Sequence, residues 1–158
     1  MAYRYEGWTT FHPILQFTIV GLFVIAGVVP MRSEPPVGLV AIAGLVLLIA
    51  IFGRLRFRVD EESVTAEFGF LGWPAQRVPL ASITRARSVS YRPILQFGGW
   101  GIRTGKLEGE RTGVYSLEGN RGVLLELSEP RRVCITSTRR FLLGTSDADR
   151  LAAAIGKP

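Results

Sequence analysis

Two long apolar runs, separated by a short polar segment, constrain this chain more than any other feature. The first spans Phe11–Val29 and the second Val37–Gly53, and neither contains a charged residue. A membrane-spanning helix needs roughly 20 apolar residues, with about 17 as the lower limit. Because only Pro30–Pro36 separates the runs, the two helices have to be antiparallel neighbours. The pattern predicts a transmembrane hairpin with helices over about 13–29 and 37–53.

Two other interpretations of the apolar runs are weaker. A pair of buried helices in a globular fold would normally keep a polar face, and these runs have none. A cleaved signal peptide would need a small-residue cleavage site, which the segment after the first run does not contain. Arginine placement favours an orientation with both termini in the cytoplasm, because Arg4 and the cluster Arg54, Arg56 and Arg58 flank the hairpin. We therefore expect a multi-pass protein of a bacterial inner (cytoplasmic) membrane.

The chain after Gly53 has a different composition and a different period. It carries 17 of the 19 basic residues and 11 of the 13 acidic ones, so most of the charge lies here, and the whole chain has a net charge of +6. Leu55, Phe57 and Val59 alternate with three arginines, as in a half-buried strand. Comparable short segments predict about seven strands, at Arg54–Asp60, Val64–Phe68, Gln76–Leu80, Thr84–Ser90, Val114–Leu117, Gly122–Ser128 and Arg132–Thr136.

Three further segments complete the expected domain, over residues 54–158. Tyr91–Gly105 is rich in glycine and aromatic residues, and we interpret it as a long loop or an irregular strand pair. Gly119-Asn120 has turn chemistry and predicts a hairpin between the flanking strands. Ser146–Asp149 resembles a capping box that starts a C-terminal helix, which Gly156 ends. The expected architecture is a small barrel or sandwich of antiparallel strands with a helix over one end, attached to the hairpin of residues 1–53.

The segment Gly98-Gly99-Trp100-Gly101-Ile102-Arg103 and its downstream spacing resemble a known family. Val114–Leu117, Gly122–Leu127 and a last strand running into the C-terminal helix follow it in the family's order. Over residues 54–156 the chain is similar to the bacterial pleckstrin-homology-like (PH-like) domains, many of which follow two transmembrane helices. The resemblance implies an all-β PH-like barrel of about seven antiparallel strands capped by a C-terminal α-helix. It implies neither an enzyme nor a defined ligand, and it makes Gly98, Gly99, Trp100, Gly101 and Arg103 the motif residues.

Candidate catalytic and metal-binding residues are few. His12 is the only histidine and Cys134 the only cysteine, so the chain cannot assemble a His/Cys metal site or a disulfide. The acidic clusters lie in predicted turns, where solvation and capping explain them more simply than acid–base chemistry does. Trp100 is either a core residue or an exposed anchor, and the core is favoured. We expect no enzyme activity and no cofactor.

Arginine is the remaining functional signal. The residues that could contact lipid or a partner are Arg54, Arg56, Arg58, Arg131, Arg132, Arg139 and Arg140. No nucleic-acid motif accompanies the basic charge, so nucleic acid is not an expected partner. Besides the lipid bilayer, we expect a protein partner or a second copy of the chain. The sequence thus predicts a membrane-anchored scaffold or binding module for protein interaction or self-association. The alternative is recognition of anionic lipid headgroups by the domain, through the doublets Arg131/Arg132 and Arg139/Arg140.

Overall fold

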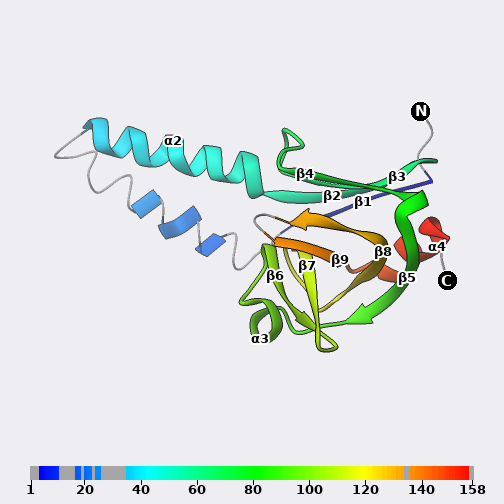
Figure 1. Ribbon diagram of the computed structural model, residues 1–158. Coiled ribbons are helices and arrows are strands. Elements are labelled where there is room, and N and C mark those ends of the chain that lie inside the picture. The colour runs from blue at the N-terminus through cyan, green and yellow to red at the C-terminus, as the bar shows by residue number, and fades with distance from the viewer. Residues whose placement is uncertain are drawn as a thin grey trace.

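Two open β-sheets pack face to face and form the body of the protein (Figure 1). The computed structural model describes residues 4–10, 17–18, 20–22, 24–25, 35–133 and 136–156. Sheet A has the strand order β1-β2-β3-β4, and sheet B has the order β5-β8-β9-β7-β6. The elements are β1 (Tyr5–Thr10), α2 (Pro35–Phe52), β2 (Arg54–Val59), β3 (Ser63–Phe68), β4 (Ala75–Pro79), η1 (Leu80–Ser82), β5 (Ile83–Ser90), α3 (Pro93–Phe97), β6 (Gly101–Leu107), β7 (Glu110–Ser116), β8 (Arg121–Val133), β9 (Thr136–Gly144) and α4 (Ala148–Ile155).

The main core lies between the two sheets. Strand β2 contributes Leu55, Phe57 and Val59, which are almost completely buried, whereas its arginines are half-buried on the outer face. Sheet B contributes side chains such as Phe141, which stacks on Tyr115 with a centroid distance of 6.3 Å. The alternation seen in the sequence therefore correctly predicted β2 and its buried face.

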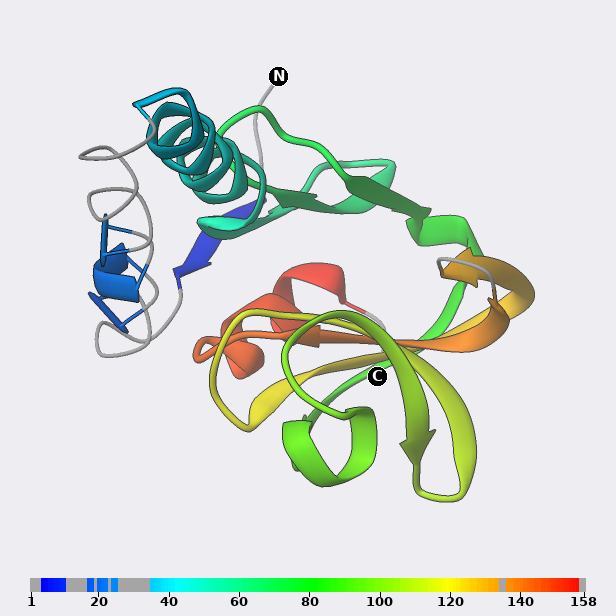
Figure 2. The ribbon, with the colours of Figure 1, turned by 90° about the vertical axis from the view of Figure 1, so that its left-hand side faces the viewer.

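Helix α4 closes one end of this core, as Figures 1 and 2 show. It buries Ala148, Leu151 and Ile155 against the sheets, and Gly156 ends it in a left-handed conformation. The helix and its stop residue are confirmed, but the capping box is wrong. The N-cap residue is Asp147, and no side chain caps the first turn.

A second, smaller core covers the other face of sheet B. It consists of Tyr91, Phe97, Leu107, Val114, Leu124 and Leu142. Helix α3 supplies Phe97, whose ring meets that of Tyr91 edge-on at 5.9 Å. Sheet B is therefore apolar on both faces, and α3 lies on the side away from sheet A (Figure 2).

The expected fold class is wrong in two respects. The structure has two open sheets with nine described strands, not one barrel of about seven antiparallel strands. Strand β9 lies between β8 and β7 and runs parallel to β7, so the hairpin predicted around Gly119-Asn120 does not form a strand pair. The resemblance to the PH-like membrane proteins is therefore not supported.

The predicted transmembrane hairpin is also wrong. Among the described residues, no helix is long and apolar enough to cross a membrane. Helix α2 has 18 residues, and a rise of 1.5 Å per residue gives it a length of about 27 Å, compared with about 30 Å for a hydrocarbon core. Most of the helix expected over 13–29 lies outside the described residues. The multi-pass inner-membrane location and its orientation, which depended on the hairpin, lose their support.

Candidate functional site

The arginines of β2 lie on the outer face of sheet A and are engaged by neighbouring strands. Arg58 pairs with Glu67 of β3 at 3.1 Å and with Glu6 of β1 at 3.5 Å, and Arg56 also reaches Glu6, at 3.6 Å. The Arg54 guanidinium lies over the Phe70 ring, 5.0 Å from its centroid. These cross-strand contacts stabilise the sheet and leave the three arginines less available to an external anion.

The two arginine doublets are not brought together as one basic surface. Neighbouring residues on a strand point to opposite faces, and Arg139 is exposed whereas Arg140 is buried. In the arm formed by β8 and β9, Arg131 is half-buried and Arg132 is exposed. Recognition of anionic headgroups remains a prediction, and the exposed residues available for it are Arg132 and Arg139.

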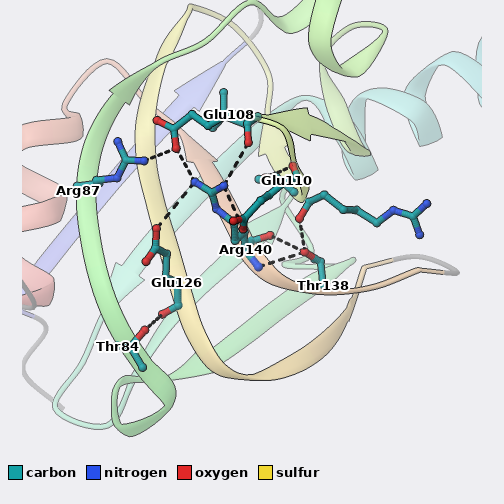
Figure 3. Close-up of polar contacts among 10 residues, drawn as sticks. Thr84, Arg87, Glu108, Glu110, Glu126, Thr138 and Arg140 are labelled. Carbon is teal, nitrogen blue, oxygen red and sulfur yellow. Dashed lines mark hydrogen bonds and ion pairs between the residues drawn. The ribbon is translucent and has the colours of Figure 1, made fainter.

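Arg140 is the centre of a polar cluster that sequence analysis did not predict (Figure 3). Only 8% of its side chain is exposed, and three carboxylates surround it. Its nearest guanidinium distances are 2.6 Å to Glu108, 3.3 Å to Glu110 and 3.8 Å to Glu126. The guanidinium also donates to the backbone oxygen of Leu107 at 3.2 Å. The cluster joins β8, β9 and the β6–β7 turn, so its residues are far apart in sequence.

Glu108 joins this cluster to the edge strand β5. Its carboxylate accepts hydrogen bonds from both Arg87 and Arg140, and these bonds lower the pKa of Glu108. The residue lies in the tight β6–β7 turn with a φ of 54°, a left-handed conformation that few residues other than glycine adopt. Because its pKa is lowered, Glu108 is ionised near neutral pH, which makes it a poor general acid or base.

A polar cavity of about 360 Å³ lies beside the cluster. Its lining consists of Thr84, Glu108, Glu110, Glu126, Leu127, Arg139 and Arg140. Arg140 is directed at all three carboxylates, so charge is largely compensated inside the protein (Figure 3). Among the described residues, no group of three His, Cys, Asp or Glu side chains is placed to hold a metal ion. His12 and Cys134 lie outside the described residues. This geometry gives sheet B ionic support.

The glycine-rich motif connects α3 to β6 and holds Trp100 at the surface. Gly98 ends α3 with a φ of 73°, and Gly99 and Gly101 also have positive φ values. The Trp100 indole N–H donates to the Gly119 oxygen at 3.3 Å, and the Arg103 Nε–H donates to the Trp100 oxygen at 3.2 Å. Trp100 is half-exposed and absent from both buried cores, so the motif places an aromatic ring where a partner can contact it.

An apolar hollow of about 390 Å³ lies between α3 and the β7–β8 connection. Tyr91, Arg92, Pro93, Ile94, Leu95, Trp100, Gly119 and Asn120 line it. Ile94 is 65% exposed and Leu95 is 77% exposed. The sequence pattern did not predict this site, because residues 91–105 were interpreted as a long loop or an irregular strand pair. The glycines that follow Phe97 are typical of loops, so the short helix Pro93–Phe97 was not predicted.

Among the described residues, exposed apolar side chains extend over α2 and the β3–β4 loop, here together called the apolar projection. Helix α2 extends away from the sheets (Figure 1), and Leu45 is the only large side chain of its described part that is buried. The loop contributes Phe70, Leu71 and Trp73, each more than 60% exposed. The exposed apolar residues of α2 are Val37, Leu39, Val40, Ile42, Val46, Leu47, Leu48 and Ile49.

The β3–β4 loop is fixed to the C-terminal end of α2. The Phe70 N–H donates to the Ala50 oxygen at 2.8 Å, and the Gly69 N–H donates to the Arg54 oxygen at 2.7 Å. Gly69 has a φ of 69°, and a Cβ at this position would overlap the carbonyl oxygens of Ala50 and Ile51. Only glycine allows this approach, so the helix end and the loop form one continuous surface.

Comparisons of the chain with protein-family models, curated proteins and solved structures gave no match.

Proposed function

We propose that this chain is a non-catalytic binding module that associates with further copies of itself through the apolar projection. The observation that supports the proposal is the exposure of the projection. Contiguous apolar patches larger than a few hundred Å² are uncommon on monomers and mark interaction surfaces. No charged residue lies within Pro35–Phe52, so no like-charge repulsion opposes contact between two such helices.

The distribution of apolar residues on α2 favours an assembly of several helices. A helix that is apolar on all sides is covered on all sides in a stable protein. A single groove would cover one stripe of α2, whereas neighbouring helices from further copies cover the remaining sides. Each copy presents the same surface, which is the condition for a symmetric homo-oligomer.

The surroundings of the projection resemble the rim of a protein interface. The outer face of sheet A begins where α2 ends and carries the paired charges of Glu6, Arg56, Arg58 and Glu67. Interfaces commonly have an apolar centre and a polar, solvated rim. In an assembly, the projection would form the centre and the outer face of sheet A would remain hydrated.

Sedimentation velocity of the full chain over a range of concentrations tests this function. We expect reversible association, and we expect Leu47→Glu to weaken it by at least about 100-fold, because a carboxylate would be placed in an apolar contact. Ala153→Glu is the matched control. It introduces the same charge at an exposed position of α4 and should leave association unchanged.

Two results would contradict self-association. One is a chain that stays monomeric at every concentration. The other is a monomer that co-sediments with uncharged phosphatidylcholine vesicles through the projection, because the partner of α2 would then be lipid and not another copy.

A further inference from the structure

The apolar hollow beside α3 is independent of the apolar projection. Helix α3 lies under sheet B, on the side away from sheet A and α2 (Figures 1 and 2). The volume of the hollow, about 390 Å³, falls within the range of about 300–1,000 Å³ found for ligand sites. A partner at this position would not compete with self-association through α2.

The side chains around the hollow are more apolar than the fold of α3 requires. Pro93 and Phe97, one helical turn apart, are buried and attach α3 to sheet B. Ile94 and Leu95 point away from that contact and are mostly exposed. Polar residues would serve equally well on this outer side of a short helix. Ile94, Leu95 and Trp100 instead lie around one hollow and are not scattered over the surface.

Two positively charged side chains border the hollow. Arg92 is the only charged residue in the lining, and Arg103 lies beside it through its hydrogen bond to the Trp100 oxygen. In the described ranges, neither arginine forms an ion pair with a carboxylate. An apolar surface bordered by unpaired guanidinium groups is complementary to an apolar group that carries an anion.

We infer that the hollow binds an apolar, acidic peptide segment of a protein partner. A leucine-like side chain of the segment packs between Leu95 and Trp100, and a neighbouring carboxylate pairs with Arg92. Tryptophan and arginine, which meet here as Trp100 and Arg92, are among the residue types that most often dominate binding energy at protein interfaces. The hydrogen bond from Trp100 to Gly119 keeps the indole in place before the segment binds.

Fluorescence anisotropy with three labelled synthetic peptides tests this inference on the full chain. The first peptide contains Glu-Leu-Leu-Glu, the second Gln-Leu-Leu-Gln and the third Glu-Ser-Ser-Glu. We expect the first to bind at least about tenfold more tightly than either of the others. The second peptide lacks the carboxylates that pair with Arg92, and the third lacks the leucine side chains that fill the hollow.

Three variants locate the binding. Arg92→Gln and Leu95→Ser change exposed side chains, so folding is preserved, and each should weaken binding of the first peptide by about tenfold. Arg150→Gln removes an exposed arginine from α4 and serves as the control, with unchanged affinity. The inference is overturned if the first peptide binds no more tightly than the other two, or if Arg92→Gln and Leu95→Ser both bind it with unchanged affinity. Because α2 is on the other side of the molecule, either result leaves self-association as a separate question.

Discussion

Arg140 is a charged side chain in a position where apolar residues are usual. Burial of a guanidinium is costly unless the charge is paired and hydrogen-bonded. Here Glu108, Glu110 and Glu126 surround it, and the Leu107 carbonyl oxygen accepts a hydrogen bond from it. The neighbouring Arg139 is exposed, although both residues belong to one doublet in the sequence. A run of like residues therefore says little about shared function when strand alternation separates them.

Replacement of Arg140 should be destabilising. Arg140→Met leaves three carboxylates near one another without their common cation. Because the side chains of Glu108 and Glu110 are 49% and 71% exposed, water partly solvates them, and we expect a cost of about 1–3 kcal/mol. Urea unfolding measures the loss. Arg139→Met is the matched control and should change the free energy of unfolding by less than about 0.5 kcal/mol. Equal effects of the two variants would show that the cluster does not stabilise the fold.

The stability of the protein should depend on pH through Glu108. Its hydrogen bonds to Arg87 and Arg140 lower its pKa in the folded state. The stabilisation is therefore complete above about pH 4.3, the usual value in an unfolded chain, and is lost as the pH falls through the lower folded-state pKa. Urea unfolding at several pH values should show a smaller acid dependence for Glu108→Gln than for the natural chain. An identical pH profile would contradict this assignment.

At the scale of single elements, alternation was a reliable guide and local composition was not. The period of two predicted β2 and β3 to within about a residue, because one face of each strand is buried. Strand β1 was missed, since Tyr5-Glu6-Gly7-Trp8 shows no clear alternation and its partner β2 is distant in sequence. The position of β9 between β7 and β8 was also missed, because strand order depends on contacts across the whole domain.

For the candidate sites, single residues could be identified from the sequence, but their surroundings could not. Sequence analysis singled out Trp100, Arg139 and Arg140, but it could not show that Arg140 is buried among carboxylates from other elements. Nor could it show that Trp100 and Leu95 share a hollow, because α3 was not recognised as a helix. The apolar composition of α2 was clear from the sequence. Its exposure depends on the direction of the helix relative to β2, the strand that follows it.

The attachment of α3 to β6 should be sensitive to a single methyl group. A Cβ at Gly105 would overlap the Gln96 carbonyl oxygen and the Phe97 ring. Gly105→Ala should therefore displace α3 and lower the free energy of unfolding by about 1–3 kcal/mol. Thr104→Ala, at the exposed neighbouring position, is the control for urea unfolding. If Gly105→Ala is as stable as the control, α3 does not pack closely on β6.

At the scale of the whole molecule, the first strand belongs to the same sheet as residues beyond the apolar segment. Tyr5 pairs with Val59 and Thr10 with Arg54, and Tyr5 also enters the main core. The outer charges agree with this arrangement, since Glu6 contacts both Arg56 and Arg58. Sheet A therefore contains residues from both sides of the apolar segment.

A fragment that contains only residues 54–158 should be less stable than the full chain. It lacks β1, so the edge of β2 is unpaired and Tyr5 no longer covers the core. We expect a lower midpoint of thermal unfolding, by about 4–8 °C for each kcal/mol lost. A synthetic peptide of residues 4–10 should partly restore it, and a peptide with Tyr5 replaced by Ser is the control. A fragment as stable as the full chain would contradict the prediction.

The pairing of Thr10 with Arg54 also makes the apolar segment a removable module for protein engineering. Partners in an antiparallel ladder have Cα atoms about 4.5–5.5 Å apart, a gap that a two-residue Asn-Gly turn closes in ordinary hairpins. Residues 11–53 could therefore be replaced by Asn-Gly, joining β1 directly to β2 while both sheets keep their strands. Such a shortened protein would be a scaffold onto which other helices or recognition loops could be grafted at the same junction.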